Sequence, residues 1–245
     1  MNDVTRLLQS HRSIRKFTDE AVPLDVINEL VRCGQAAATS SNVQAVTVIR
    51  VTDTAKREAL AEFAGGQKYV VSAGAFLVYC ADMNRPRYAC ERLDGEYAAG
   101  MTEQFIIATV DVALAAQNAV VAAESMGLGI CYIGGLRNKP AEVSELLGLP
   151  NHVYPVFGLC LGYPAQDPEV KPRLPLGAVL MEDTYDSGVF DANIDQYDAE
   201  VQHYYMTRTG GNKDSTWSQE MKGLVGKESR PHMLGFLQGK AFLQK

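Results

Sequence analysis

The chain has 245 residues, of which 47% are apolar and 21% charged, so it can bury a core without disulfides or structural metals. Its net charge of −6 disfavours nucleic-acid binding. The N-terminus has no basic stretch followed by an apolar core, and no apolar run approaches the length of a membrane span, which disfavours secretion and membrane insertion.

Cysteine and histidine usage points to a reduced compartment and away from metal chemistry. The cysteines form no CxxC pair and mostly lie in apolar runs, which indicates reduced thiols in a cytoplasmic protein. The histidines are scattered and no carboxylates cluster near them, so we expect no metal site. The residues concerned are Cys33, Cys80, Cys90, Cys131, Cys160, His11, His152, His203 and His232.

The first half of the chain alternates helical and strand patterns. Apolar spacing predicts helices over residues 4–10 and 24–37, which flank the polar segment 11–15. Apolar runs at residues 45–51, rich in β-branched side chains, and 75–81 predict two buried strands.

Residues 102–126 contain no glycine or proline and are rich in alanine, which predicts a long helix that stops at Gly127. Small side chains let a second helix approach closely. The pattern therefore fits either a central packing or dimer helix, or a buried core helix of a monomer.

The next elements complete a sheet. Residues 130–133 predict a short strand, Asn138 and Pro140 the cap and first turn of a helix, and residues 153–161 a further strand. About four strands interleaved with helices indicate an α+β fold with a mixed sheet covered by helices.

Charge divides the C-terminal part of the chain. Residues 182–200 hold seven acids, and no Lys or Arg occurs between Arg173 and Arg208, which predicts a solvated excursion rather than core. Residues 203–245 instead carry a net charge of +4. A basic tail on an acidic protein indicates, with similar weight, a local anionic ligand or a solvated basic face.

Two basic clusters suit a phosphate group. His11-Arg12-Ser13-Ile14-Arg15 places two guanidinium groups and a hydroxyl within five residues, and Lys171-Pro172-Arg173 holds two cations on a stiff backbone. An Arg-rich helix end on the surface is the alternative interpretation of the first cluster.

Two further segments suit the rest of an aromatic cofactor. Gly134-Gly135 after a strand lets backbone N–H groups approach a planar ring, although a simple tight turn is the better explanation of the pair on its own. The loop Thr39-Ser40-Ser41-Asn42-Val43-Gln44 offers donors and acceptors for a ribityl chain. Phosphate loops of the GxxxxGK[ST] type, HExxH and GxSxG are absent from the sequence.

These segments resemble, in order and over nearly the whole chain, the oxygen-insensitive nitroreductase and NADPH–flavin oxidoreductase family, in its NADPH-preferring group. The motifs that carry the resemblance are His11-Arg12-Ser13-Ile14-Arg15-Lys16-Phe17, Gly65-Gly66-Gln67-Lys68, Ala123-Glu124-Ser125-Met126-Gly127-Leu128-Gly129, Tyr132-Ile133-Gly134-Gly135-Leu136-Arg137-Asn138, Lys171-Pro172-Arg173-Leu174-Pro175 and Glu228-Ser229-Arg230-Pro231.

The resemblance implies an intertwined homodimer with a central mixed or antiparallel sheet flanked by helices, and two FMN sites between the chains. Residues 1–245 would form a single FMN-binding domain, with 182–245 as an extended excursion and C-terminal arm. The loop 39–44 would line the flavin from the partner subunit or near the pocket mouth. The implied FMN-binding residues are His11, Arg12, Ser13, Arg15, Thr39, Ser40, Ser41, Gln44, Gln67, Tyr132, Ile133, Gly134, Gly135, Leu136, Lys171 and Arg173.

The resemblance also implies individual roles. Arg15 would lie near the flavin pyrimidine edge, where negative charge accumulates on reduction, and Gly134 or Gly135 would face N5, the atom that receives hydride. No side chain acts as a nucleophile, so no catalytic residue is assigned.

The implied sites for donor and acceptor lie elsewhere in the chain. Arg208, with Lys213, would bind the 2′-phosphate of NADPH, and Arg230 would lie at the substrate mouth from the partner chain and hold a nitro or carboxylate group of the substrate. Asn42 stands where relatives tend to carry a bulky apolar residue against substrate, which puts the acceptor range in doubt.

The implied activity is a two-electron, ping-pong hydride transfer from NADPH through FMN to nitroaromatics, quinones or free flavins. The alternatives are a flavin reductase that supplies reduced FMN to a monooxygenase or luciferase, and a non-catalytic flavin-binding protein. The expected partners are a second copy of the chain and small-molecule acceptors, without nucleic acid or membrane, in the cytoplasm.

Overall fold

The computed structural model describes residues 2–209 and 211–245, which form two compact units. One unit comprises the chain up to residue 166 together with residues 230–245, and the other comprises residues 167–229. We describe each unit separately.

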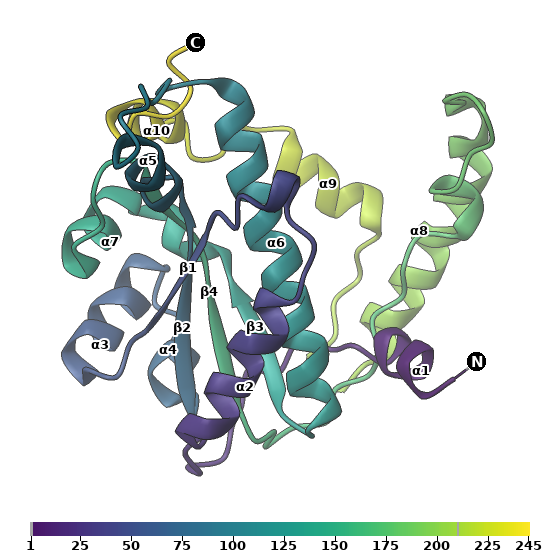
Figure 1. Ribbon diagram of the computed structural model, residues 1–245. Helices are drawn as coiled ribbons and strands as arrows, with labels where there is room; N and C mark the ends of the chain where they lie inside the picture. Colours follow the sequence, from purple (N-terminus) through teal and green to yellow (C-terminus); the bar gives the residue numbers. More distant parts are fainter. Residues whose placement is uncertain (1, 210) are drawn as a thin grey trace. The chain divides into compact units, whose positions relative to one another are not determined.

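A four-stranded sheet forms the centre of the first unit (Figure 1). Its strands are β1 (Val46–Arg50), β2 (Ala75–Asp82), β3 (Gly129–Ile133) and β4 (Val153–Gly162), in the spatial order β1-β2-β4-β3. All three pairings are antiparallel, which confirms the antiparallel form of the expected sheet rather than the mixed one. The one parallel pairing among the described residues is an isolated bridge between Ser13 and Ile130.

Helices cover both faces of the sheet, which explains why β2 is apolar up to its last residue, Asp82. Alternate side chains of this strand enter two separate cores, with Leu77 and Tyr79 on one face and Phe76 and Val78 on the other. The first face packs against α2 (Leu24–Gln35) and α6 (Thr102–Ser125), and the second against α3 (Thr54–Phe63), α4 (Tyr69–Ser72) and α7 (Pro140–Leu147) (Figure 1).

The alanine-rich helix α6 packs closely against α2, as its small residues predict. A side chain at Gly34 of α2 would lie 2.9 Å from the carbonyl oxygen of Ala115, so only glycine fits there at this helix separation. The inward face of α6 is core, and the helix ends just before Gly127, whose φ of 78° is the left-handed conformation expected of a helix stop.

Helix α6 is also long and apolar enough, by length and composition, to cross a membrane. This corrects the expectation that no apolar run approaches that length. One such helix is weak evidence for a membrane span, because core helices pass the same test, and α6 packs here against α2 and the sheet.

The remaining helices of this unit are short. The predicted cap of α7 is wrong: the helix begins at Pro140 as expected, but Lys139 precedes it as the cap, and Asn138 belongs to the preceding 3-10 turn. The short elements are α1 (Asp3–Gln9), η1 (Ser40–Asn42), α5 (Asn84–Glu91), η2 (Gly134–Asn138) and α10 (Met233–Gly239).

The second unit contains a helix where the acidic composition predicts a solvated excursion. Helix α8 (Phe190–Thr207) exposes most of its acids, but Tyr197, Val201 and Tyr205 lie four residues apart and form a small buried cluster. Helix α9 (Trp217–Val225) adds Trp217 to this cluster and begins with a capping box. The 3-10 turns η3 (Leu176–Ala178) and η4 (Ser187–Val189) precede α8.

Candidate functional site

The polar segment 11–15 lies along β3, at one edge of the sheet. The Ile14 backbone N–H donates to the Ile130 carbonyl at 2.8 Å. A side chain at Gly129 would come within 2.8 Å of Ile14 Cβ, so the glycine is what allows this close approach. The first basic cluster is therefore fixed to the strand that leads into Gly134-Gly135.

His11 is held by a carboxylate that the sequence did not single out. Its Nδ1 lies 2.5 Å from Glu124 Oε1, and 28% and 13% of the two side chains are exposed. Glu124 is at the end of α6, and its charge, after burial, contributes to raising the pKa of Tyr132 to about 12. Glu124 therefore fixes the imidazole ring and keeps the neighbouring phenol protonated.

Arg15 lies close to Tyr69 and Cys131. Burial raises the pKa of Tyr69, while a hydrogen bond and the charge of Arg15 oppose that shift. Arg15 also opposes the rise that burial causes in the pKa of the Cys131 thiol. The guanidinium thus lies next to the residues that follow Gln67 and to the strand before Gly134.

The two glycine segments pack against each other. A Cβ on Gly135 would lie 2.5 Å from the Ala64 carbonyl oxygen, and one on Gly65 would lie 3.7 Å from Asn138 Nδ2. Gly135 therefore has a packing reason as well as the proposed ligand-binding one. Leu136 is fully buried beneath the turn.

Gln67 carries an orphaned polar atom at this junction. Its side-chain oxygen Oε1 is buried and has no hydrogen-bond partner among the described residues. A buried acceptor without a donor costs about 1–3 kcal/mol. The Gln67 side chain therefore has an unmet hydrogen-bond acceptor in the protein alone.

Arg230 reaches the same turn. Its Nε donates to Asn138 Oδ1 at 2.9 Å, and His232 Nε2 lies 2.9 Å from the Arg137 carbonyl. Burial first, and then the charge of Arg230, lower the pKa of Arg137. The predicted substrate residue thus lies beside the glycine turn of its own chain.

The loop 39–44 lies at the other edge of the sheet, before β1. Asp111 of α6 is 1% exposed, and its two carboxylate oxygens accept the Ser40 N–H at 3.1 Å and the Ala45 N–H at 3.0 Å. Between these anchors Ser41, Asn42 and Gln44 have φ values of 46°, 58° and 54°, which non-glycine residues rarely adopt. Sequence reasoning missed Asp111, although it is the only charged residue between Phe105 and Ala123.

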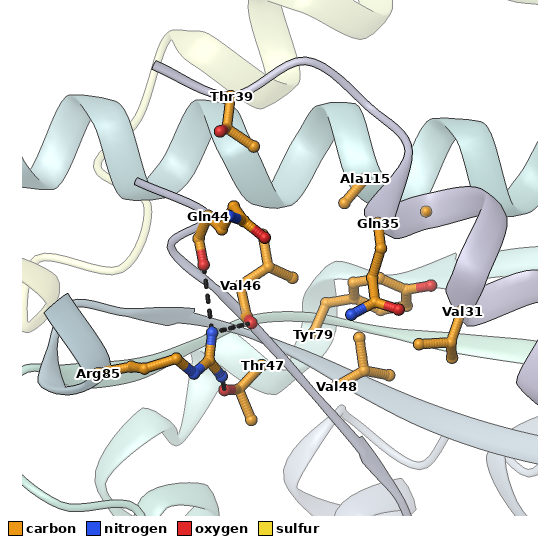
Figure 2. A pocket seen from close by; sticks show the side chains of 11 residues that line it. Val31, Gln35, Thr39, Gln44, Val46, Thr47, Val48, Tyr79, Arg85 and Ala115 are labelled. Atoms are coloured by element: carbon orange, nitrogen blue, oxygen red, sulfur yellow. Dashed lines mark hydrogen bonds between the residues drawn. The ribbon is translucent and has the colours of Figure 1, made fainter. Parts of the chain in front are cut away.

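The same loop borders a cavity of about 500 Å³ between α2, α6 and β1. Figure 2 shows Arg85 beneath the loop, where it donates to the Gln44 and Val46 carbonyls at 3.2 Å each and to Thr47 Oγ1 at 2.7 Å. The Tyr79 hydroxyl is buried there without a hydrogen-bond partner among the described residues. Burial raises the pKa of Tyr79 and keeps the phenol protonated.

The predicted FMN residues of this unit therefore fall into two groups. Strands β1 and β3 are the two edges of the sheet, three strand spacings apart, or about 14 Å. The β3 edge brings together His11, Arg12, Ser13, Arg15, Gln67, Tyr132, Ile133, Gly134, Gly135, Leu136 and Arg230. The β1 edge carries Thr39, Ser40, Ser41, Asn42 and Gln44.

The predicted cations of the second unit lie together. Lys171 Nζ donates to the Tyr205 hydroxyl at 2.7 Å, and Arg173 donates to the Lys171 carbonyl at 2.7 Å. Lys213 Nζ is 4.2 Å and Arg208 Cζ is 4.9 Å from the centre of the Tyr205 ring. Sequence reasoning placed these cations in two separate sites and did not identify Tyr205.

Comparisons with known proteins assign the chain to a family. The model of the nitroreductase family matches residues 8–163, and that of the nitroreductase family C-terminal domain matches residues 171–245. The NADPH-flavin oxidoreductase of Vibrio harveyi is 46% identical over 245 residues and is covered completely, as is this chain.

Two further proteins are similar to this chain over nearly its whole length. The oxygen-insensitive NADPH nitroreductase of Salmonella typhimurium is 43% identical over 237 residues, which cover 97% of each chain. The solved structure of NfrA1 from B. megaterium has a TM-score of 0.96 and 43% identity, and the match covers 99% of this chain and all of that one.

Proposed function

The chain belongs to the nitroreductase family, and on that premise we propose how its residues bind FMN and NADPH and reduce nitro compounds, quinones or free flavin. The protein is an NADPH-dependent oxidoreductase that uses FMN, and its substrates are small molecules. FMN, when bound, accepts hydride from NADPH and passes it to the acceptor. The single observation that carries our assignment of its site is the orphaned oxygen of Gln67.

The β3 edge suits the flavin ring. The pyrimidine ring of FMN brings an N–H donor, which Gln67 Oε1 lacks in the protein alone. Arg15 is the cation beside this position and stabilises negative charge on the pyrimidine edge. Gly134 and Gly135 carry no side chain that would cover their backbone N–H groups, and the partly exposed Tyr132 supplies apolar surface, while Ile133 and Leu136 are fully buried and support the turn from beneath.

The ring and phosphate of FMN need different partners. His11, oriented by Glu124, and Arg12 and Ser13 supply hydrogen-bond donors on the same edge. Lys171 and Arg173 are the cations that we assign to the FMN phosphate, for which bidentate Arg and a fixed backbone are suited.

The protein is a homodimer in our proposal, with each FMN held by both chains. The loop 39–44 lies at the sheet edge opposite Gly134-Gly135, so a second chain is needed to bring both groups of residues to one flavin. An apolar stripe on α6 supports this arrangement: Ile106, Val110 and Leu114 are 47%, 49% and 44% exposed. Residues 1–245 then work as one functional domain, although the chain forms two units.

Arg208 and Lys213 bind the 2′-phosphate of NADPH, while Arg230 and Asn42 contact the acceptor. Arg208 follows the last residue of α8, and its Nε donates to the Gly211 carbonyl at 2.9 Å, while its guanidinium is the group that we assign to the phosphate. Arg230 lies beside the glycine turn, where it holds a nitro or carboxylate group.

A cytoplasmic location fits the thiols. The cysteines of the described chain are free, and Cys80, Cys131 and Cys160 are buried. Burial raises the pKa of these three thiols, which keeps them protonated and unreactive.

Anaerobic stopped-flow absorbance tests the function. The purified protein is mixed with NADPH, with NADH, and then with nitrofurazone after reduction. We expect rapid bleaching of the flavin by NADPH, slower bleaching by NADH, and recovery of the colour with nitrofurazone. A flavin that NADPH fails to bleach contradicts the proposal and supports a non-catalytic flavin-binding protein.

The choice of acceptor separates two enzyme functions. The similarity to a protein named NADPH-flavin oxidoreductase supports free flavin as the acceptor of this chain. A KM for free FMN far below those for quinones and nitrofurans identifies a flavin reductase that supplies a partner monooxygenase or luciferase.

A further inference from the structure

Three cations in the second unit surround one buried tyrosine. Tyr205 of α8 is 4% exposed, and its hydroxyl accepts a hydrogen bond from Lys171 Nζ at 2.7 Å. Lys213 Nζ and Arg208 Cζ lie 4.2 Å and 4.9 Å from the centre of its ring. The cations around Tyr205 therefore come from segments that precede and follow α8 in the sequence.

The ring face offsets repulsion among these charges. A cation over an aromatic face is attracted by the ring quadrupole. Glu220 Oε2 lies 2.7 Å from Lys213 Nζ, and Glu169 accepts from Thr209 next to Arg208. Three cations and two carboxylates leave this group one positive charge in excess, so it is suited to an anion.

Several contacts hold the Arg208 guanidinium group in a fixed position. The Arg208 backbone N–H donates to the Tyr204 carbonyl at 2.9 Å, its Nε donates to Gly211, and its guanidinium carbon lies 5.8 Å from the centre of the Tyr204 ring. Two aromatic rings and one carbonyl thus fix the side chain. Fixing a long side chain before binding removes an entropic cost from the bound state.

We infer that Tyr205 is a positioning residue that sets the selectivity for the 2′-phosphate of NADPH, by holding Arg208 and Lys213 together through its ring. The inference rests on the proposed function, in which these two residues bind that phosphate. The hydroxyl of Tyr205 has a separate task, because it contacts Lys171, the cation assigned to FMN. Ring and hydroxyl are therefore separable by substitution.

Binding of two nucleotides to the FMN-loaded protein, measured by titration calorimetry, tests this inference. The probes are 2′,5′-ADP, which carries the 2′-phosphate, and 5′-AMP, which lacks it. The quantity compared is the Kd for 5′-AMP divided by the Kd for 2′,5′-ADP, which is large when the protein selects the 2′-phosphate. We expect Tyr205→Leu to reduce this ratio about tenfold, equivalent to ~1.4 kcal/mol, and Tyr205→Phe to leave it within about twofold.

Two further variants make the result specific. Val201→Ala truncates a side chain in the same buried cluster without touching a cation, so its ratio should match the wild type even if the unit loses stability. Arg208→Ala removes the proposed phosphate ligand itself and should abolish most of the selectivity. In turnover assays at saturating FMN, Tyr205→Leu should raise the KM for NADPH far more than the KM for NADH, and Tyr205→Phe, which also loses the hydroxyl bond to Lys171, controls for any effect on FMN binding.

The outcomes separate the inference from its premise. An unchanged ratio in Tyr205→Leu, with selectivity lost in Arg208→Ala, overturns the role of Tyr205 and leaves the NADPH site in place. A ratio that Arg208→Ala fails to change overturns both the proposed NADPH site and the inference. An equal loss of selectivity in Val201→Ala assigns the effect to general loosening of the cluster and also overturns the inference.

Discussion

The two edges of the sheet position their ligand-binding residues by different means. At the β3 edge, residues 11–15 lie against the strand through backbone bonds, and Gly129 and Gly135 permit contacts too close for any side chain. At the β1 edge, the loop 39–44 contains three residues with left-handed backbones, and a single buried carboxylate, Asp111, binds both ends.

The two sheet edges should therefore be damaged by different kinds of substitution. The β3 edge depends on the absence of side chains, so added atoms damage it. The β1 edge depends on side chains, Asp111 above all, that hold an unfavourable backbone, so removal of atoms damages it. The predictions below use both routes.

The largest effect is expected for Asp111→Ala. Two backbone N–H groups lose their acceptor, and one of them is fully buried, so the free energy of unfolding should fall by about 3 kcal/mol. FMN affinity should fall as the loop relaxes. Urea unfolding and FMN titration of the apoprotein, at fixed protein concentration, measure both.

Thr109→Val is the matched control for Asp111→Ala. Thr109 is also a hydrogen-bonding residue of α6, and its hydroxyl contacts Phe105 and Tyr154, not the loop. This variant should lose about 1 kcal/mol and keep its FMN affinity. Equal losses of FMN affinity in the two variants would refute the anchoring role of Asp111.

Gly135→Ala should have the next largest effect, at the opposite edge. Its Cβ would lie 2.5 Å from the backbone oxygen of Ala64, so the two glycine segments must separate, at a cost of about 2 kcal/mol. FMN affinity should fall with the stability. Gly235→Ala, a helical position with nothing within 4 Å, serves as the control and should not destabilise the protein.

Gln67→Leu should change the stability of the apoprotein and of the FMN-loaded protein differently. It removes an orphaned acceptor, so the apoprotein should gain about 1 kcal/mol in free energy of unfolding. The FMN-loaded protein should gain less or lose stability, because the ligand loses its acceptor. Thermal unfolding with and without FMN measures the difference, and equal gains in both states would show that Gln67 does not contact the ligand.

The smallest effect is expected for Ser41→Gly, which relieves a φ of 46° in the loop. The gain in apoprotein stability should be about 0.5 kcal/mol, because the relief of strain is partly offset by the greater freedom of glycine in the unfolded chain. In the Asp111→Ala background the gain should shrink, because the loop has already relaxed. A double-mutant cycle measures this coupling.

The sequence predicted the sheet well because its strands depend on local patterns. The runs at 45–51, 75–81 and 153–161 coincide with β1, β2 and β4 to within a residue. Helix α8 was missed because four acids of its own obscure the stripe of Tyr197, Val201 and Tyr205, whose burial depends on partners from distant segments.

The candidate site was predicted through short motifs, and the residues outside them were missed. Glu124, Asp111 and Tyr205 each act on a segment between 34 and 113 residues away, through contacts that no spacing rule encodes. The division of the site between two sheet edges also required the strand order, since residues 39–44 and 134–135 look equally suited to one pocket in the sequence.

Complementation between two defective variants tests the central claim most directly. Arg15→Glu damages the β3 edge and Ser41→Glu the β1 edge, and each homodimer should bind little FMN. If each flavin contacts the β3 edge of one chain and the β1 loop of its partner, a mixed dimer contains one site with both lesions and one with neither. We therefore predict that exchange of subunits restores one FMN per mixed dimer, with NADPH oxidation to match. A mixed dimer that binds no more FMN than its parents would place both edges of each site in the same chain and contradict the account.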